Sequence, residues 1–222
     1  MRRGDDQTNR VPRPFRLGDV EWSVAGTGAA WQNVDGSPSS SHAVEWGIRK
    51  DRIGIMGFSA GGHLAASAST LFDSGDPKAA DPVARESSGP DFTLLVYPVI
   101  TLGSLGHGGS CANLLGPNPA SALIERFSAE KQVSKLTLPA YVAHAIDDRG
   151  VPIENARLYV AALKAHRVPV QLLELPSGDH GLNGYQGPMW DAWQTGSLAW
   201  FADRGFIPAA EPERPSADPT RK

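Results

Sequence analysis

From about residue 42 onward, apolar residues fall into short runs that are separated by longer stretches with helical periodicity. Four of these runs have the length and apolar content of buried parallel strands. They are Arg52–Phe58, Phe92–Ile100, Pro139–Ile146 and Val170–Leu175. Between the last two runs, Ile153–Arg167 places apolar residues at the i, i+3, i+4 and i+7 positions of an amphipathic helix. This alternation predicts an α/β fold, a mostly parallel sheet with helices on both faces.

Further helical stretches complete this outline. Helices are predicted before the first strand, directly after it, and near the C-terminus: Ala43–Ile48, Ser59–Ser69 and Trp190–Phe206. Shorter helical fragments are expected at about 110–115 and 119–127, whereas 73–91 is rich in Asp, Pro, Gly and Ser and predicts a loop. We therefore expect one domain over 41–207, with a small cap-like insertion at about 101–137.

The two ends of the chain lack such patterns. Residues 1–40 show neither a helical nor a strand period, and we expect a poorly ordered leader there. Residues 208–222 are rich in Pro, Glu, Asp and Arg, and we expect a disordered tail. No apolar stretch follows Arg2 and Arg3, so the chain as written carries no secretory signal and is expected to be cytoplasmic.

Composition and charge exclude several functional classes. The 222 residues carry 21 Lys and Arg against 24 Asp and Glu, a net charge of −3, which provides no electrostatic basis for binding nucleic acid or an anionic membrane. The longest nearly apolar run spans about ten residues, half of the roughly twenty that a membrane-spanning helix needs. Cys111 is the single cysteine, so no intramolecular disulfide and no multi-cysteine metal site can form.

Candidate chemistry begins where the first predicted strand ends. Gly57-Phe58-Ser59-Ala60-Gly61 fits the pattern G-x-S-x-G between a strand and a helix. The glycines let neighbouring backbone pass close to a sharp turn, which would lift the Ser59 hydroxyl clear of the sheet edge. The backbone N–H of Ala60 would lie at the helix N-terminus, where it could face a developing oxyanion. The pattern predicts Ser59 as a nucleophile.

A serine needs a base and a carboxylate partner to act as a nucleophile. The base candidate is His180, in Ser177–Gly181 just after the last predicted strand, and the carboxylate candidates are the adjacent Asp147 and Asp148 after the third strand. The chain order serine, aspartate, histidine is the one expected after such an elbow. The pattern predicts acyl transfer through Ser59, a reaction that needs no cofactor and no metal.

The remaining histidines and the cysteine have structural interpretations. His63 is expected to pack or hydrogen-bond one turn after the elbow, and a bond from His144 to backbone would order the acid turn. His166 is placed near a helix C-terminus, in solvent, and Cys111 is interpreted as a small apolar residue. Two histidines have no predicted partner: His42 and His107. A metal site is disfavoured because it would leave the elbow unexplained, and its ligands would be Asp147, Asp148, Asp179 and His180.

These stretches together resemble the α/β-hydrolase superfamily, over residues from about 42 to 206. The resemblance is strongest to its bacterial esterase branch, which includes acetyl xylan esterases, feruloyl esterase-like domains and prolyl-oligopeptidase-related hydrolases. The matching stretches are RIGIMGFSAGGHLAA at Arg52–Ala66, NLLGP at Asn113–Pro117, FSAEK at Phe127–Lys131, HAIDDRGVP at His144–Pro152 and SGDHG at Ser177–Gly181.

Two motifs of this family bear on the candidate residues. The acid turn H-G-x-x-D implies Asp148 rather than Asp147 as the acid, with Ala145 in place of the glycine. The base loop G-G-H-G has an aspartate at its second position here, Asp179, which would raise the pKa of the base if the two side chains approach. The resemblance implies a serine esterase for short-acyl, especially acetyl, esters of small-molecule or carbohydrate alcohols.

The chain departs from the family pattern before the elbow. Family members carry further strands there and an H-G-G oxyanion loop, but 58 residues precede Ser59 and none of them shows that motif. His107-Gly108-Gly109 has the right letters but follows the elbow, and we interpret it as a flexible loop. We therefore expect an N-terminally truncated hydrolase fold, whose elbow strand Ile53–Phe58 has an unpaired edge and could form a homo-oligomer.

Two other functions stay open at this point. One is an inactive or weakly active remnant of a hydrolase that serves at most as a binding or self-associating module, which the missing motif favours. The other is a serine peptidase of the prolyl-oligopeptidase-related type, because such enzymes use the same three residue types.

Overall fold

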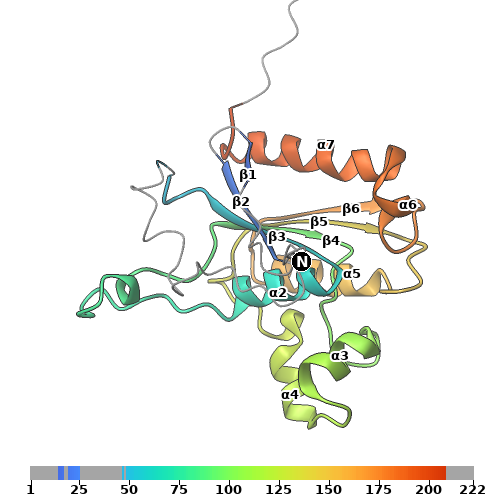
Figure 1. Ribbon diagram of the computed structural model, residues 1–222, viewed down its shortest axis with the longest axis horizontal. Coiled ribbons are helices and arrows are strands. Elements are labelled where there is room, and N and C mark those ends of the chain that lie inside the picture. The colour runs from blue at the N-terminus through green and yellow to red at the C-terminus, as the bar shows by residue number, and fades with distance from the viewer. Residues whose placement is uncertain (1–14, 18–19, 26–46, 48, 209–222) are drawn as a thin grey trace, which may run out of the picture.

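A six-stranded sheet forms the centre of the molecule. The computed structural model describes residues 15–17, 20–25, 47 and 49–208, the first two ranges as strand backbone. In spatial order the strands are β1 (Phe15–Leu17), β2 (Val20–Ala25), β3 (Ile53–Phe58), β4 (Phe92–Val96), β5 (Ala140–Ala145) and β6 (Val170–Leu175) (Figure 1). β1 pairs antiparallel with β2, and every other neighbouring pair is parallel.

The four strands that the hydrophobic runs predict are confirmed as β3 to β6. β6 has the predicted bounds, whereas β4 ends at Val96 instead of continuing to Ile100. Tyr97 takes a φ of 39°, in the left-handed region, and the next residue is Pro98, which has no N–H to donate to a neighbouring strand. The apolar run therefore leaves the sheet at Tyr97, although Val99 and Ile100 are still fully buried.

Two expectations, one about residues 1–40 and one about the edge of β3, are wrong. The sequence predicts no strand within residues 1–40, but β1 and β2 lie there. The elbow strand β3 also has no unpaired edge, because it pairs with β2 on one side and β4 on the other. Within β2 the apolar residues Val20, Trp22 and Val24 alternate with polar ones, a short strand pattern that the sequence-based prediction overlooked. The rest of the leader, the helix predicted at Ala43–Ile48 apart from Gly47, and residues 209–222 lie outside the described residues.

Helices cover both faces of the sheet. α2 (Ser59–Thr70) and α5 (Glu154–Ala165) pack on one face and α7 (Gly187–Asp203) on the other (Figure 1). Successive strand residues serve opposite faces: Ile55 belongs to the core under α2 and α5, and Met56 to the core under α7. The α7 core is rich in aromatic side chains, which include Phe92, Tyr141, Trp193, Trp200 and Phe201.

The insertion between β4 and β5 holds two short helices, as predicted. α3 (Gly108–Leu115) and α4 (Ser121–Phe127) have no buried residues and lie beside the main body in Figure 1, followed by a 3₁₀ turn at Ala129–Lys131. The interpretation of His107-Gly108-Gly109 as a flexible loop is wrong. His107 caps α3, because its Nδ1 accepts a hydrogen bond from the Ser110 N–H at 3.1 Å.

The remaining short elements lie in the connections. A 3₁₀ turn at Val83–Arg85 interrupts the predicted 73–91 loop, and α6 (Leu182–Tyr185) lies between β6 and α7. Among the helices that the structure describes, none is long and apolar enough to cross a membrane.

Candidate active site

The turn from β3 into α2 carries Ser59 in a strained conformation. Ser59 has a φ of 52°, which L-residues rarely adopt, and it is the first residue of α2. Gly57 is required here because a Cβ at this position would lie 2.1 Å from the carbonyl oxygen of Gly61. Gly62 is equally constrained, since its Cβ would lie 2.6 Å from the Pro98 Cβ. The turn therefore works only with its small residues, and it holds the Ser59 hydroxyl at the carboxyl end of the strand.

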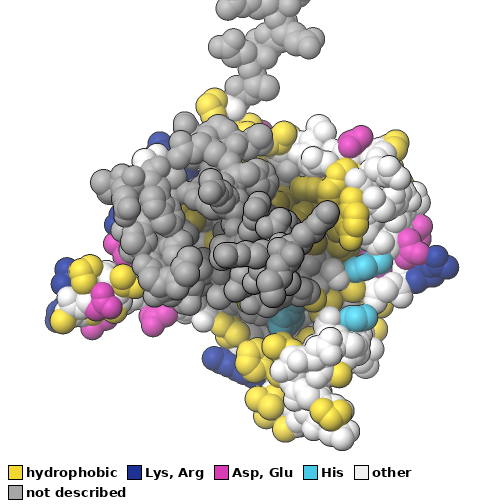
Figure 2. All heavy atoms as spheres, viewed as in Figure 1, with side chains coloured by type: hydrophobic (Ala, Val, Ile, Leu, Met, Phe, Trp, Pro, Cys, Tyr) yellow, Lys and Arg dark blue, Asp and Glu magenta, His cyan; other side chains and the backbone are white. Residues whose placement is uncertain are grey.

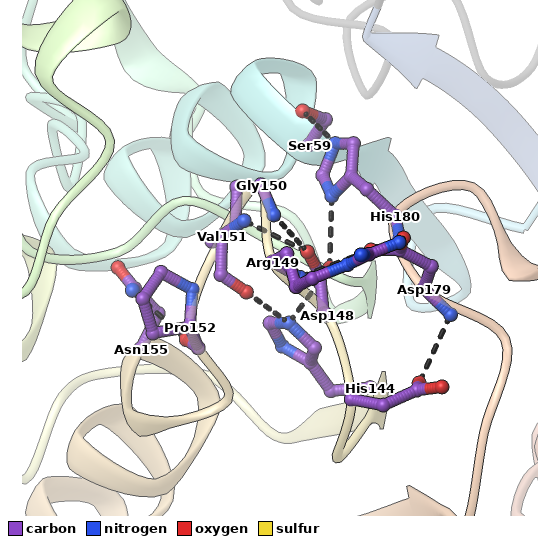
Figure 3. A network of polar contacts seen from close by, with 11 residues as sticks. Ser59, His144, Asp148, Arg149, Gly150, Val151, Pro152, Asn155, Asp179 and His180 are labelled. Atoms are coloured by element: carbon purple, nitrogen blue, oxygen red, sulfur yellow. Dashed lines mark hydrogen bonds and ion pairs between the residues drawn. The ribbon is translucent and has the colours of Figure 1, made fainter.

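Ser59, His180 and Asp148 form a continuous chain of hydrogen bonds (Figure 3). The distance from Ser59 Oγ to His180 Nε2 is 2.8 Å, and His180 Nδ1 lies 2.8 Å from Asp148 Oδ2. An ionised carboxylate only accepts, so Nδ1 carries the imidazole proton and Nε2 is free to accept from the serine hydroxyl. The three residues come from the ends of β3, β6 and β5, which meet at one edge of the sheet.

The Asp148 carboxylate is held from several sides. Its Oδ1 accepts hydrogen bonds from the backbone N–H groups of Gly150, at 2.9 Å, and Val151, at 2.8 Å. Its side chain is fully buried, and burial alone would raise the pKa of this carboxyl. The hydrogen bonds from His144, His180 and the Val151 amide outweigh burial and hold that pKa well below its usual range. Asp148 therefore carries its negative charge at neutral pH.

The neighbouring Asp147 makes different contacts. Its carboxylate accepts hydrogen bonds from the backbone N–H groups of Gly178, at 3.3 Å, and Asp179, at 3.0 Å. Of the two carboxylates that the sequence left in competition, the structure brings Asp148 to His180 and turns Asp147 toward the backbone of the base loop. Asp147 thus anchors the loop that carries His180.

Asp179, in the base loop, makes contacts in the opposite direction, to Arg149 in the turn that carries Asp148. Its carboxylate accepts hydrogen bonds from the backbone N–H of Arg149, at 3.0 Å, from the Arg149 guanidinium and from the His180 N–H. The Arg149 amide, the guanidinium and the His180 amide lower the pKa of Asp179 to about 2. The Asp179 carboxylate therefore contacts Arg149 and does not approach the His180 imidazole.

The N-terminus of α2 lies beside Ser59. The first four N–H groups of a helix have no acceptor within the helix, and the residue before α2, Phe58, provides no side-chain cap. The Ala60 N–H belongs to this first turn, so it is available to an anion next to the Ser59 hydroxyl. The second donor expected of the family, an H-G-G loop, does not come from His107-Gly108-Gly109, which begins helix α3.

An open pocket of about 400 Å³ adjoins the serine. It is lined by Phe58, Ser59, Tyr97, His180, Tyr185 and Trp190. The Tyr97 ring packs edge-on against the His180 ring at a centroid distance of 4.9 Å, and burial raises the pKa of its hydroxyl. On the face shown in Figure 2, hydrophobic side chains gather beside a histidine.

Sequence reasoning missed the aromatic lining of this pocket. Tyr97 lay inside the predicted strand Phe92–Ile100, so the prediction did not place it at a strand end, whereas the observed strand β4 ends at Val96. Tyr185 sits in a left-handed turn that no periodicity predicts: Leu182, Asn183 and Tyr185 all have φ between 50° and 66°. Such residues are strained, and here they aim an exposed tyrosine at the pocket.

A buried amide was also missed. Asn155, on the first turn of α5, accepts hydrogen bonds from the Ile100 and Thr101 N–H groups and donates to the carbonyl groups of Leu105 and Pro152. It ties the segment after β4 to the segment after the acid turn. An asparagine near a predicted helix start indicates a cap, so the sequence offered no signal for this role.

The other residues singled out from the sequence have structural contacts. His63 Nε2 lies 2.7 Å from the Phe127 carbonyl oxygen, and His144 Nε2 lies 2.9 Å from that of Val151. His166 is exposed at the end of α5 and contacts the Ala162 carbonyl oxygen, and Cys111 packs against a small apolar cluster. His42 lies outside the described residues. Within the described part of the chain, no three His, Cys, Asp or Glu residues converge on a point where a metal ion could bind.

Comparison with known proteins agrees with this fold. The sequence model of the family described as BD-FAE matches residues 40–163, more than half of the chain. Endo-1,4-beta-xylanase B of Butyrivibrio fibrisolvens is 37% identical over 159 residues, which are 71% of this chain and 25% of that protein. An acetylxylan esterase of Xylanibacter ruminicola is 38% identical over 144 residues, 63% of this chain and 28% of that protein. The chain thus spans about a quarter of the length of these curated relatives.

Solved structures are similar over most of this chain. The acetyl ester-xyloside bifunctional hydrolase from Caldicellulosiruptor lactoaceticus is 43% identical, with a TM-score of 0.72 over 76% of this chain and 62% of that one. The carboxylesterase Cest-2923 from Lactobacillus plantarum is 25% identical, with a TM-score of 0.61 over 77% and 65%. The family match, the sheet order and the serine elbow agree, and the chain belongs to the BD-FAE family, within the bacterial esterase branch of the α/β-hydrolase superfamily.

Proposed function

We propose that this chain hydrolyses carboxylic esters through an acyl-serine intermediate on Ser59. The observation that carries the proposal is the pair of 2.8 Å contacts that join Ser59 to His180 and His180 to Asp148. This arrangement allows a neutral imidazole to take the serine proton while a buried carboxylate stabilises the imidazolium that forms. The names of the relatives, which include an acetylxylan esterase and a carboxylesterase, agree with ester chemistry.

The proposed reaction proceeds in two halves. The Ser59 oxygen attacks the ester carbonyl carbon as His180 Nε2 takes its proton, and the Ala60 N–H stabilises the negative charge on the former carbonyl oxygen. The tetrahedral intermediate then collapses, and His180 returns the proton to the departing alcohol. A water molecule repeats the attack on the acyl-serine, with His180 again as base, and releases the acid. Side chains, backbone and water supply every group that these steps need.

The substrate we propose is a short-acyl ester, in particular the acetyl ester of a carbohydrate. The pocket at Ser59 is open and lined by aromatic rings from Phe58, Tyr97 and Trp190, which suits the apolar face of a sugar or an aryl alcohol. Acetyl groups and xylose-containing substrates appear in the names of two relatives, the Xylanibacter esterase and the Caldicellulosiruptor hydrolase. Both considerations support acetylated xylan fragments as the first substrates to try.

The test combines covalent labelling with substrate hydrolysis. A fluorophosphonate probe should label the purified monomer, and labelling should be lost in Ser59→Ala and fall strongly in His180→Ala. Ser121→Ala, which changes an exposed serine of α4, serves as the matched control and should label normally. Hydrolysis should be faster for p-nitrophenyl acetate than for the butyrate and octanoate esters, and should release acetate from acetylated xylan.

Each rival function gives a different result in this test. Absence of labelling in folded protein would contradict the proposal and favour the inactive remnant. Labelling together with faster cleavage of an amide than of the matching ester would favour the serine peptidase.

A further inference from the structure

The oxygen of Asp148 that contacts His180 has a second imidazole beside it. His144, on β5, lies four residues before Asp148, and its Nε2 is 3.2 Å from Asp148 Oδ2 (Figure 3). His180 Nδ1 lies 2.8 Å from the same oxygen. Two imidazole rings therefore approach one carboxylate oxygen, while the other oxygen is occupied by two backbone N–H groups.

The surroundings of His144 define which of its nitrogens carries a proton. The side chain is fully buried, and Nε2 also lies 2.9 Å from the Val151 carbonyl oxygen. Both of its neighbours are acceptors, so Nε2 must carry a hydrogen. Nδ1 is buried and has no hydrogen-bond partner among the described residues, so a second proton there would place an unpaired charged donor in the core. His144 is thus a neutral ring whose one N–H is shared by two oxygens.

We infer that His144 is a positioning residue that limits how strongly Asp148 increases the basicity of His180. Two N–H donors on one carboxylate oxygen compete for the same negative charge, so each bond is weaker than it would be alone. His144 also prevents the carboxylate from rotating, because it links Asp148 to the Val151 carbonyl within the acid turn. The catalytic part of this inference rests on the proposed function, whereas the hydrogen-bond part does not.

Few other ionisable groups face this cluster. Tyr97, at the end of β4, packs on His180, and Glu174 pairs with His144 in the β5–β6 register, where it is bound to Arg157. Asp179 neighbours His180 in sequence and is bound to Arg149. The charge of Glu174 also acts on His144, but Asp148 is the carboxylate that contacts both imidazoles.

Substitutions at His144 show whether this residue limits the basicity of His180 or only supports the turn that carries Asp148. His144→Leu removes the N–H, and Asp148 Oδ2 then interacts with His180 alone. The imidazolium of His180 becomes more stable, so the acidic limb of the kcat/KM profile for p-nitrophenyl acetate should move to higher pH by about 0.5 to 1 unit. His144→Gln places an amide N–H near the position of Nε2 and should restore the wild-type limb. If His144 merely supported the turn, Asp148 would be less well held in His144→Leu and would stabilise the imidazolium less. An acidic limb that stays at the same pH or moves to lower pH would therefore overturn the inference.

Nuclear magnetic resonance tests the same inference without activity or variants. In the wild-type protein, the ¹⁵N signals of His144 should show a proton on Nε2 and none on Nδ1 at neutral pH. The opposite tautomer would overturn the inference, since Nε2 could then donate to neither oxygen. If the chain proves not to hydrolyse esters, the titration of His180 by NMR in wild type, His144→Leu and His144→Gln replaces the kinetic profile. Failure of the proposed function and failure of this inference are therefore distinguishable.

Discussion

At the scale of single residues, the loop after β5 that carries Asp148 (the acid loop) and the loop after β6 that carries His180 (the base loop) are joined by hydrogen bonds in both directions. Asp147 reaches from the acid loop to the N–H groups of the base loop, and Asp179 reaches from the base loop to Arg149 in the acid loop. Asp148 and His180 make their own contact between these two bonds. The reciprocal arrangement fixes the relative position of the two loops more firmly than any one of its hydrogen bonds could.

The Asp179 contacts lead to a pH-dependent contribution to stability. The folded pKa of about 2 lies below the ordinary value of about 3.9, so Asp179 stabilises the fold above pH 4 and loses this effect as the pH falls toward 2. Asp179→Asn should therefore lower the urea midpoint at pH 7, and the difference from wild type should shrink between pH 4 and pH 2.

Asp191→Asn, which changes an exposed aspartate on α7, provides the control. A constant difference across this pH range, or an effect of equal size in the control, would contradict the assignment.

Gly57 offers a sharp test of the elbow. The Cβ of Gly57→Ala would overlap the Gly61 carbonyl, and since that atom belongs to backbone, the turn itself must move. A displacement of about 1 Å at a nucleophile can cost about 10²-fold in rate, so fluorophosphonate labelling should fall by about that factor or the variant should not fold. Gly108→Ala is the matched change, because its Cβ meets no atom within 4 Å and lies in the first turn of α3.

The control should label as wild type does and unfold at the same or slightly higher urea concentration, since alanine is preferred over glycine in helices by about 0.5–1 kcal/mol. Equal labelling of Gly57→Ala and wild type would show that the turn tolerates a side chain.

Some of the site could be predicted from these residues and some could not. The serine elbow is local, so its glycines, its strand and its helix all lie within one short stretch of sequence. The choice between Asp147 and Asp148 depends on the direction in which two adjacent side chains point, and it came from the family motif. The pairing of Asp179 with Arg149 joins loops some thirty residues apart, and no local pattern encodes it.

At the scale of elements, α2 carries the site and is tied to the insertion. His63, one turn after Ser59, donates a hydrogen bond to the carbonyl of Phe127 at the end of α4. The small residues of α2, among them Ala65 and Ala66, bring the helix close to β3 and β4. The nucleophile helix is therefore held by the sheet on one side and by the insertion on the other.

The buried position of His63 predicts a loss of stability in mild acid. Burial lowers the pKa of this histidine below its ordinary value of about 6.5, only partly offset by the bond to Phe127. The unfolded chain therefore binds this proton more readily, and the stability that the neutral ring contributes is lost as the pH falls below about 6.5. His63→Gln can keep the N–H donor without titrating. Urea unfolding at pH 7 and pH 5 should show a smaller loss for this variant, and identical losses would contradict the prediction.

The predictions of elements succeeded where burial produced a long apolar run and failed where a strand is short or the backbone is strained. β3 to β5 are apolar because they are covered on both faces, and this leaves a clear signal in the sequence, whereas β6 exposes Gln171 and Glu174. β2 pairs with β3, and the alternating apolar residues Val20, Trp22 and Val24 that indicate this strand were overlooked because they span so few positions. The left-handed turn at Leu182–Tyr185 was likewise not predictable, because strained backbone has no periodicity.

At the scale of the whole molecule, the described part divides into a central sheet with two cores and a peripheral insertion. β4 and β5 lie between other strands and are buried throughout, whereas α3 and α4 contain no buried residue. Local stability should follow this division, because exposed helices open at little cost.

Hydrogen exchange measures that division directly. Peptides from β4 and β5 should exchange most slowly, at a rate set by global unfolding, and peptides from α3 and α4 should exchange faster by orders of magnitude. The comparison within one molecule needs no variant. Slow exchange in α3 and α4 would mean that the insertion is stabilised as strongly as the sheet.

The hydrogen bonds of Asp147 and Asp179 between the acid and base loops also determine how this site can deform. Asp148 and His180 belong to one stiff body, while Ser59 belongs to another, formed by β3, the elbow and α2. The sheet joins the two bodies through β4, and within the triad the bond from Ser59 Oγ to His180 Nε2 links them. Heat, pressure or a distant substitution will therefore stretch that bond before the bond from His180 to Asp148. The protein would lose its nucleophile first, with the charge pair beneath it still intact.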